Sequence, residues 1–130
     1  MKKIEIKTPS CESDIYCGEG AIKKVLPEVL GGRNIFTVTD SNVYKLYGGF
    51  IAQNFAPLGE VHVIPAGEKS KNYSCLLGIL KHMLSAGLKR GGTVVALGGG
   101  VVGDIAGLAA SLYMRGVRLV PIPTPLLSHV

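Results

Sequence analysis

Residues 93–115 constrain the fold of this chain most, because they read as a strand, a glycine turn and a helix in direct succession. The run 94–97 is short, apolar and β-branched, as is typical of a buried strand in a parallel sheet. Three glycines follow at 98–100, and an Ala-, Leu- and Gly-rich segment comes after them. Such a turn presents free backbone N–H groups and a positive helix end, so this stretch predicts a phosphate-binding turn.

Two simpler interpretations compete with phosphate binding. From Gly98 to Gly103 the glycines fit the G-x-G-x-x-G spacing, which is weak evidence by itself. The first alternative is a membrane helix, because the glycines from Gly99 to Gly107 also have the small-residue spacing of membrane helix pairs. A membrane-spanning helix needs about 20 apolar residues, however, and the charged Asp104 interrupts this segment. The second alternative is that the glycines only allow the helix to pack closely on the sheet. Three glycines in succession are conformationally costly, however, where nothing has to approach the backbone. We therefore favour phosphate binding and expect no membrane span. A carboxylate in this apolar helix should also have a specific partner.

The composition is that of one globular domain. The chain has 130 residues, of which 47% are hydrophobic and 18% charged, so it can bury a core and does not belong to the disordered class. The formal net charge is +5, but the lysines are scattered and there is no tryptophan. A nucleic-acid partner is therefore not predicted, whereas an anionic cofactor or substrate would suit the positive charge.

Cysteines, histidines and the N-terminus restrict the location and the chemistry. The cysteines are odd in number and show no C-x-x-C spacing, which fits a reducing cytosol better than a disulfide framework. The lysines near the N-terminus are not followed by an apolar run, so no signal peptide is predicted and the expected location is cytoplasmic. His62, His82 and His129 lack metal-ligand spacing, so no metal site is predicted in this chain.

The rest of the chain alternates between strand and helix patterns. Apolar runs of strand type predict further strands at 3–7, 15–17, 34–39, 60–64 and 117–122, the first two pairing with each other. Helical spacing predicts helices at 21–30, 43–51 and 70–86 besides the one after the glycine turn, which Gly116 should end. This alternation predicts an α/β fold with a doubly wound, mostly parallel sheet. Pro121, Pro123 and Pro125 cannot donate to a ladder, so the far end of the last strand is expected at a sheet edge or already in a loop.

Helix ends and apolar stripes can also be assigned. Asp40 or Ser41 is expected to cap the second helix and the glycines at 48–49 to weaken it, while Ser70 should cap the third helix and Gly87 end it. The residues expected to face the core are Val43, Leu46, Phe50 and Ile51 in the second helix, and Leu76, Leu77, Leu80, Met83 and Leu84 in the third.

The carboxyl ends of parallel strands meet at one edge of a sheet, where ligands bind. Residues 40–42, 67–68, 98–100 and 123–124 should therefore converge there, and their carboxylates, small polar groups and glycines suit a ribose–pyrophosphate ligand. The usual dinucleotide motif has an acidic residue about 20 positions after its glycines, which this chain lacks. Asp40 could supply that carboxylate from an earlier strand, or it could simply cap a helix.

Several motifs together resemble the nucleotide-binding domain of the 3-dehydroquinate synthase family. They are GGGVVGDIAGLAASLYMRG at 98–116, VPIPTPLLSHV at 120–130, PAGEKSK at 65–71 in place of P-x-G-E-x-x-K, and TDSN at 39–42. Other sugar-phosphate cyclases share a close version of this pattern, and the iron-dependent alcohol and glycerol dehydrogenases a looser one. The resemblance implies a Rossmann-like, NAD-binding N-terminal domain over 1–130, without the helical, metal-binding C-terminal domain of that family.

In that family, an enzyme converts 3-deoxy-arabino-heptulosonate 7-phosphate to 3-dehydroquinate and phosphate in the shikimate pathway. The resemblance implies NAD-assisted oxidation of a hydroxyl, phosphate elimination, return of the hydride, ring opening and an aldol closure. It also implies a zinc or cobalt ion in the C-terminal domain and a homodimeric full-length protein, so this chain alone should be inactive. Another sugar-phosphate cyclase, a polyol dehydrogenase or a stand-alone nucleotide-binding module remain alternatives.

The resemblance also implies roles for individual residues. By position, Asp40 and Asn42 would contact the adenosine part of NAD, and Glu68 and Lys71 would lie along the cofactor. Gly99, Gly100 and Val101 would meet the pyrophosphate, Asp104 would face the nicotinamide half, and Thr124 and Leu127 would flank the cofactor. Arg115 would bind the phosphate or carboxylate end of the substrate. Simpler roles are a surface lysine for Lys71 and a helix cap for Arg115. The family usually has two threonines where this chain reads Thr124-Pro125, so one hydroxyl and one N–H are lost.

Overall fold

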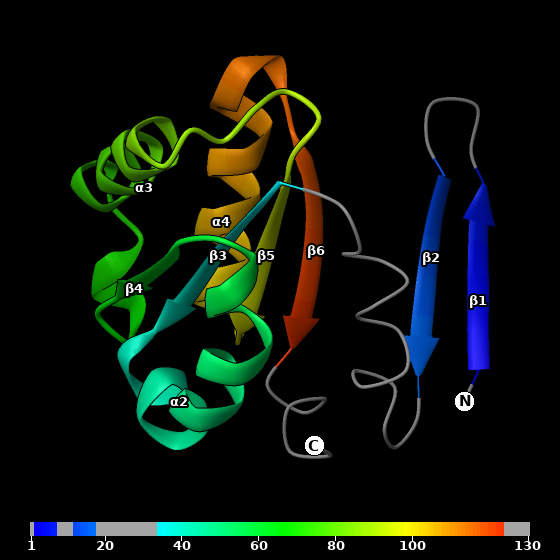
Figure 1. The fold of residues 1–130 in the computed structure, drawn as a ribbon, viewed down its shortest axis with the longest axis horizontal. Helices are drawn as coiled ribbons and strands as arrows, with labels where there is room; N and C mark the ends of the chain where they lie inside the picture. Colours follow the sequence, from blue (N-terminus) through cyan, green and yellow to red (C-terminus); the bar gives the residue numbers. More distant parts are fainter. Residues whose placement is uncertain (1, 8–11, 18–33, 124–130) are drawn as a thin grey trace. The chain divides into compact units, whose positions relative to one another are not determined.

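The computed structural model describes residues 2–7, 12–17 and 34–123 (Figure 1). The chain divides into two compact units, one of Met1–Gly31 with Pro125–Val130 and the other of Gly32–Thr124, and each is described by itself. The helix predicted at 21–30 lies outside the described residues. So do Thr124, Pro125 and Leu127.

The first unit contains an antiparallel pair of strands. β1 (Lys2–Lys7) pairs with β2 (Glu12–Cys17), and Ile4 lies opposite Ile15. The alternation of apolar and polar residues in β1 predicted such a strand. Both predicted strands and their pairing are confirmed.

The second unit is an α/β layer structure with a fully parallel sheet. In chain order its elements are β3 (Ile35–Asp40), α2 (Ser41–Asn54), η1 (Ala56–Leu58), β4 (Val61–Ile64), η2 (Glu68–Ser70), α3 (Tyr73–Ser85), β5 (Thr93–Gly98), α4 (Gly100–Leu112), η3 (Tyr113–Arg115) and β6 (Arg118–Pro123). The strand order is β4-β3-β5-β6. The predicted α/β fold with a parallel sheet is confirmed, and β6 lies at an edge of the described sheet, as its prolines indicated.

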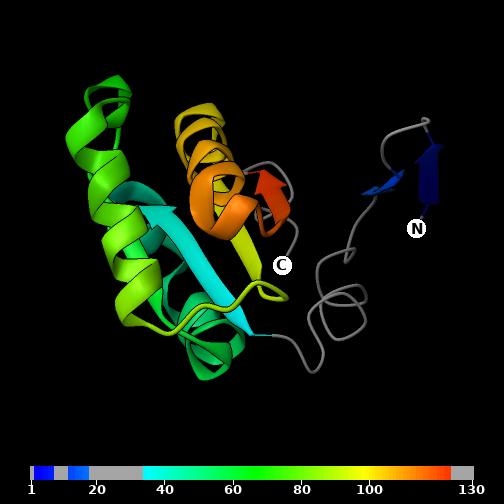
Figure 2. The same cartoon turned by 90° about the horizontal axis from the view of Figure 1, so that it is seen from above.

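The connections run in opposite directions from the middle of the sheet. From β3 the chain moves outward to β4, whereas from β5 it moves outward to β6 on the other side. Because parallel crossovers are right-handed, this reversal puts α2 on one face of the sheet and α3 with α4 on the other. Figure 2 shows α3 and α4 side by side along the sheet. The sheet is therefore doubly wound.

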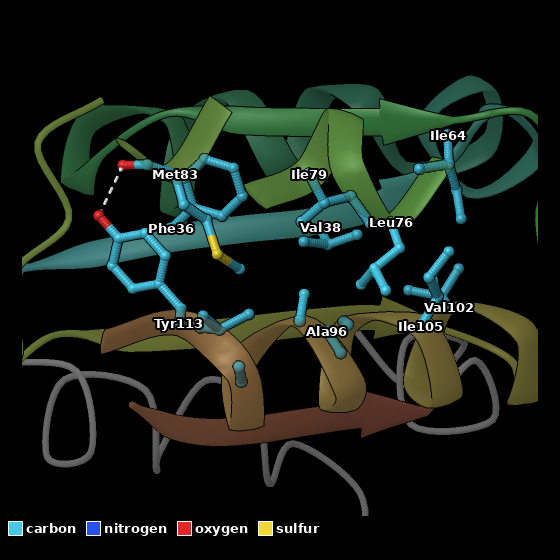
Figure 3. Packing of buried hydrophobic residues seen from close by; sticks show 14 of the residues in the cluster. Phe36, Val38, Ile64, Leu76, Ile79, Met83, Ala96, Val102, Ile105 and Tyr113 are labelled. Atoms are coloured by element: carbon cyan, nitrogen blue, oxygen red, sulfur yellow. Dashed lines mark hydrogen bonds between the residues drawn. The ribbon is translucent and has the colours of Figure 1, made fainter. Parts of the chain in front are cut away.

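The main core lies between the sheet and the helices α3 and α4 (Figure 3). The two central strands have apolar side chains that are fully or almost fully buried there, as expected for strands covered on both faces. The buried cluster includes Phe36, Val38, Val94 and Ala96 from the strands, Leu76, Ile79 and Met83 from α3, and Val102, Ile105, Ala106 and Ala109 from α4. A hydrogen bond of 2.9 Å from the Thr39 hydroxyl to the Leu97 carbonyl ties β3 to β5 on the other face.

The predicted apolar stripe of α2 is only partly right. Val43 and Ile51 are buried, but Leu46 is 73% exposed and Phe50 only half-buried. Tyr47 leaves helical geometry at φ −123° and ψ 21°, one residue before the glycine pair that was expected to weaken the helix. The helical geometry is interrupted at this kink, so one periodic apolar stripe does not run through the whole of α2.

The start and the stripe of α3 also differ from the prediction. Asn72, not Ser70, caps the helix, because its Oδ1 atom accepts a hydrogen bond of 2.8 Å from the Cys75 N–H. The residues that α3 buries are Leu76, Ile79 and Met83, whereas the predicted Leu77 and Leu84 are exposed and Leu80 is only partly buried. The buried stripe is thus narrower than predicted and turned by one position.

The helix α3 ends at the glycine that the sequence predicted, whereas α4 ends before its predicted glycine. Gly87 ends α3 with a φ of 75°, and the Leu88 N–H donates to the Met83 carbonyl at 3.1 Å, which confirms the predicted glycine stop. In contrast, α4 ends at Leu112, before the predicted stop at Gly116. The intervening turn η3 is anchored by Tyr113, whose buried hydroxyl donates to the Leu88 carbonyl at 2.7 Å. Tyr113 itself leaves helical geometry, with a φ of −75° and a ψ of 123°.

Candidate functional site

The strand connections of the sheet diverge between the carboxyl ends of β3 and β5. These neighbouring strands lead outward to opposite sides of the sheet, and ligands of doubly wound sheets bind where the connections diverge in this way. Asp40 ends β3 and Gly98 ends β5. In Figure 1 the arrowheads of β5 and β6 point to this edge. The predicted convergence of 40–42 with 98–100 is therefore confirmed.

Gly98 is required at the start of the glycine turn. Its φ of +149° is one that residues with a side chain rarely adopt. A Cβ atom there would lie 3.0 Å from Cγ2 of Val102 and 3.6 Å from Cγ2 of Val43. In contrast, a Cβ atom at Gly100 would meet nothing within 4 Å, so the side of the turn at Gly100 is open.

The N-terminus of α4 has no side-chain cap. Gly99 occupies the N-cap position, and the backbone bonds of the helix begin with the Gly103 N–H, which donates to the Gly99 carbonyl at 3.0 Å. The two other α-helices that the structure describes are capped, α2 by Asp40 and α3 by Asn72. The first-turn N–H groups of α4 are therefore left for an external acceptor, and an anion would suit them.

Asp40 caps α2. Its Oδ1 atom accepts a hydrogen bond of 2.8 Å from the Val43 N–H, which confirms the simpler of the two roles that the sequence allowed. A carboxylate has a second oxygen, so capping does not exclude a further contact. Asn42 is exposed in the first turn of the same helix. Ser41, whose wider role the sequence did not indicate, accepts a 3.0 Å bond from the Ala66 N–H and so ties α2 to the loop after β4.

Three of the predicted residues meet at this edge. The Nζ atom of Lys71 lies 2.8 Å from Oδ2 of Asp104 and 3.6 Å from Oε2 of Glu68. The hydrogen bond with Asp104, followed by the charges of Asp104 and Glu68, raises the pKa of Lys71, so this side chain is cationic. The expectation that Asp104 has a specific partner is confirmed.

The loop that carries Glu68 and Lys71 is folded tightly. Ser70, predicted as a helix cap, is buried there instead, and its hydroxyl donates to the carbonyl of Pro65. Gly67 has a φ of 104°, which a glycine adopts without strain. The sequence suggested Ser70 as important, because serine often bonds to nearby backbone, but it did not show which backbone group.

Arg115 does not join the other predicted residues. It lies in η3, beyond the last residue of α4, with a φ of 68°. Since α4 has 13 residues, its length of about 20 Å separates Arg115 from the glycine turn. The predicted contact with the substrate would therefore require a surface at the other end of this helix.

A histidine pair lies away from this edge. The Nδ1 atoms of His62 on β4 and His82 on α3 are 2.8 Å apart, and Nε2 of His82 is 3.7 Å from Oε2 of Glu60. Burial and the neighbouring His82 lower the pKa of His62. Within residues 2–7, 12–17 and 34–123, no group of three or more His, Cys, Asp or Glu side chains could hold a metal ion.

A cavity of about 540 Å³ opens at the opposite edge, at the amino ends of β3 and β4. Its walls include Ile35, Ala56 and Leu88, and they include none of the predicted site residues. The predicted site is therefore an exposed edge with a glycine turn rather than this hollow. None of the helices in the described ranges has the length and apolarity that a membrane crossing requires.

The family model and the curated relatives agree on one family. The family described as 3-dehydroquinate synthase N-terminal matches residues 61–130. A 3-dehydroquinate synthase of Alkaliphilus metalliredigens is 40% identical over 131 residues, covering 100% of this chain and 37% of that protein. One of Rhizobium etli is 42% identical over 123 residues, covering 90% of this chain and 33% of that protein. The chain thus spans about a third of the length of these curated relatives.

Solved structures of two sugar-phosphate cyclases resemble the fold. A 2-deoxy-scyllo-inosose synthase, solved with carbaglucose-6-phosphate, NAD+ and Co2+, matches with a TM-score of 0.79 and 26% identity, covering 95% of this chain and 35% of that one. A 2-epi-5-epi-valiolone synthase from Streptomyces hygroscopicus, with NAD+ and Zn2+ bound, matches with a TM-score of 0.63 and 34% identity, covering 75% of this chain and 31% of that one.

Proposed function

This chain belongs to the 3-dehydroquinate synthase N-terminal family, and on that premise we propose that it is the NAD-binding part of a 3-dehydroquinate synthase. The observation that carries the proposal is the uncapped N-terminus of α4, which lies beside the end of β3 where the strand connections diverge. A pyrophosphate needs such an anion site. The solved relatives with NAD+ bound support NAD as the ligand.

The residues at this edge suit the parts of NAD. Backbone N–H groups at Gly99, Gly100 and Val101 would hold the pyrophosphate, since the side of the turn at Gly100 is open. The second oxygen of Asp40 would accept from a ribose hydroxyl while the first keeps its cap. Asn42 would join Asp40 at the adenosine.

The charged cluster would lie on the other side of the pyrophosphate. Lys71 is cationic, but its two carboxylate partners leave the cluster without excess positive charge, so Lys71 would contact the cofactor through its ammonium N–H groups rather than attract it by net charge. Glu68 would lie along NAD with it, and Asp104 would face the nicotinamide half. Thr124 and Leu127 would flank the cofactor, and Arg115 would contact a substrate at the far end of α4.

For the whole protein, we propose conversion of 3-deoxy-arabino-heptulosonate 7-phosphate to 3-dehydroquinate and phosphate. Bound NAD supplies a reversible hydride acceptor for the oxidation of a substrate hydroxyl. The residues of this chain bind and orient the cofactor, and a divalent metal and most of the substrate pocket would come from the part of the relatives that this chain does not cover. A homodimer is proposed for the full-length protein.

A second candidate is a sugar-phosphate cyclase with another substrate. It is favoured by the resemblance to 2-deoxy-scyllo-inosose synthase and 2-epi-5-epi-valiolone synthase. All these enzymes would share the NAD site, so cofactor binding does not separate them. Phosphate release by the full-length protein, measured with each sugar phosphate in turn, distinguishes the candidates.

Calorimetric titration with NAD+ tests the proposal for this chain. We expect saturable but weak binding, because the chain supplies only one side of the cleft of its relatives. Sub-micromolar affinity would contradict a half-site, and no binding would contradict the NAD site itself. We also expect no phosphate release by the isolated chain with substrate, NAD+ and zinc, and measurable turnover would show that the remaining part is dispensable.

A further inference from the structure

One buried hydroxyl shapes the loop that carries Glu68 and Lys71. Ser70 is 3% exposed, whereas the other buried polar side chains in the described ranges are threonines of the sheet strands. Its hydroxyl donates to the Pro65 carbonyl at the start of the loop, and its N–H donates to the Gly67 carbonyl at 3.1 Å. Ser70 therefore holds the two ends of this loop together.

Lys71 itself is the central residue of an inverse γ-turn. Its φ of −78° and ψ of 71° are those of this turn, and the Asn72 N–H closes it by donating to the Ser70 carbonyl at 2.9 Å. Asn72 is fixed in turn, because it caps α3 through the Cys75 N–H and donates from Nδ2 to the Lys69 carbonyl. The residues on both sides of Lys71, Ser70 and Asn72, are thus held by hydrogen bonds, and we call this pair of anchored residues the clamp.

This clamp directs Lys71 towards α4. The side chain is still 39% exposed, yet its ammonium lies 2.8 Å from Asp104, which belongs to another element. Ser70, in contrast, is buried, and its hydroxyl is already engaged with Pro65. Because Ser70 is only 3% exposed, it does not itself meet a ligand at the edge of the sheet, and Lys71, the next residue, is the cation through which it would act.

We propose that Ser70 is a positioning residue that holds Lys71 in place to contact NAD. The inference rests on the proposed function, in which Lys71 lies along the cofactor. With alanine at position 70, the Pro65 carbonyl loses its donor and the turn at Lys71 loosens. The pair with Asp104 is then made less often, and NAD+ binds more weakly. A merely structural Ser70 would lower the stability of the unit but leave the pairing of Lys71 in folded molecules unchanged.

Competitive acetylation of the folded chain with acetic anhydride, read by mass spectrometry, tests the clamp without any cofactor. In the unmodified chain we expect Lys71 to react more slowly than the exposed Lys45 of α2, because its ion pair disfavours the free amine. In Ser70→Ala the rate at Lys71, relative to Lys45, should rise about threefold, because a looser turn pairs Lys71 with Asp104 less often and leaves more of the free amine. Ser70→Thr, which keeps the hydroxyl, should retain the slow rate.

The matched control is Ser85→Ala, which removes an exposed hydroxyl on α3 that donates to the His82 carbonyl at 3.1 Å. It should leave the rate at Lys71 unchanged. The proposal is overturned if Ser70→Ala leaves that rate unchanged, or if Ser70→Thr raises it as much as alanine does. In the second case the hydroxyl would not be what holds Lys71.

Calorimetry with NAD+ then tests whether Ser70 acts through Lys71. Ser70→Ala should weaken NAD+ binding about threefold to tenfold when Lys71 is present, and should have no further effect in a Lys71→Gln background. Equal weakening in both backgrounds would overturn the positioning role. If the unmodified chain does not bind NAD+, the proposed function fails, while the acetylation rates still decide whether Ser70 holds Lys71.

Discussion

The ammonium of Lys71 lies 2.8 Å from the Oδ2 atom of Asp104, and this ion pair joins the loop after β4 to the second turn of α4. The two side chains are 39% and 67% exposed, so solvent screens the pair and it contributes little to stability. The ion pair instead holds the ammonium of Lys71 near the uncapped N-terminus of α4 before a ligand binds. Preorganisation of this kind lowers the entropic cost of binding.

Replacing Lys71 by glutamine should therefore weaken NAD+ binding far more than it changes stability. A charge-assisted hydrogen bond from Lys71 to NAD+ contributes enough that we expect about a tenfold or larger rise in the dissociation constant. Thermal melting should stay close to that of the unmodified chain. Lys69→Gln, in the same loop and exposed, is the control. Similar losses of affinity in both variants would mean that only net charge matters.

The two ends of the glycine turn should respond differently to alanine. Gly98→Ala should destabilise the fold by about 1–3 kcal/mol, because it needs an unfavourable φ and brings a Cβ atom to 3.0 Å from Val102. Gly100→Ala has open space for its methyl group, so its stability in urea should be maintained. Its affinity for NAD+ should fall, because the methyl group would stand on the open side of the turn where we propose that the pyrophosphate binds. Equal stability of the two variants would contradict this account of the turn.

The histidine pair should make the fold sensitive to acid. The pKa of His62 in the folded chain lies below its usual value of 6.5, because burial and His82 disfavour a second positive charge. The unfolded chain then binds the proton more readily, so stability should be fully present above pH 6.5 and decline as the pH falls through the lowered pKa. Urea unfolding of His62→Gln should show a shallower decline. An identical pH dependence in the variant would exclude His62 as its source.

Tyr113 should anchor the turn after α4 through its hydroxyl. The phenol is 6% exposed, donates to the Leu88 carbonyl at 2.7 Å and lies 3.4 Å from the Met83 carbonyl (Figure 3). Tyr113→Phe leaves those buried carbonyls without this donor and should cost about 1–2 kcal/mol of unfolding free energy. Tyr73→Phe, at a side chain that is 73% exposed, should cost nothing measurable. Equal effects in the two variants would contradict the anchor.

Much of the fold could be predicted because its signals are local. The apolar runs of β3 and β5, the glycine stop at Gly87 and the cap at Asp40 all depend on residues close together in the chain. The start of α3 could not be decided in this way. Ser70 and Asn72 are both good capping residues, and the choice between them depends on the Pro65 carbonyl, which engages the Ser70 hydroxyl.

The site was predictable as a set of strand ends but not as a set of contacts. Parallel topology brings Asp40 and Gly98 to one edge whatever their side chains do. The pair of Lys71 with Asp104, however, joins residues far apart in sequence, and its existence depends on the path of the η2 loop. Arg115 shows that closeness in sequence does not ensure closeness in space. It belongs to the same motif as the glycines, yet the whole length of α4 separates it from them.

We propose that this chain binds NAD at the carboxyl edge of its parallel sheet. Titration of the isotopically labelled chain with NAD+, followed by amide NMR shifts, tests it most directly. We predict saturable shifts concentrated at Gly99, Gly100 and Val101 and in the first turn of α2. Shifts confined to the cavity around Ile35, Ala56 and Leu88 at the opposite edge, or no saturable shifts at all, would contradict it.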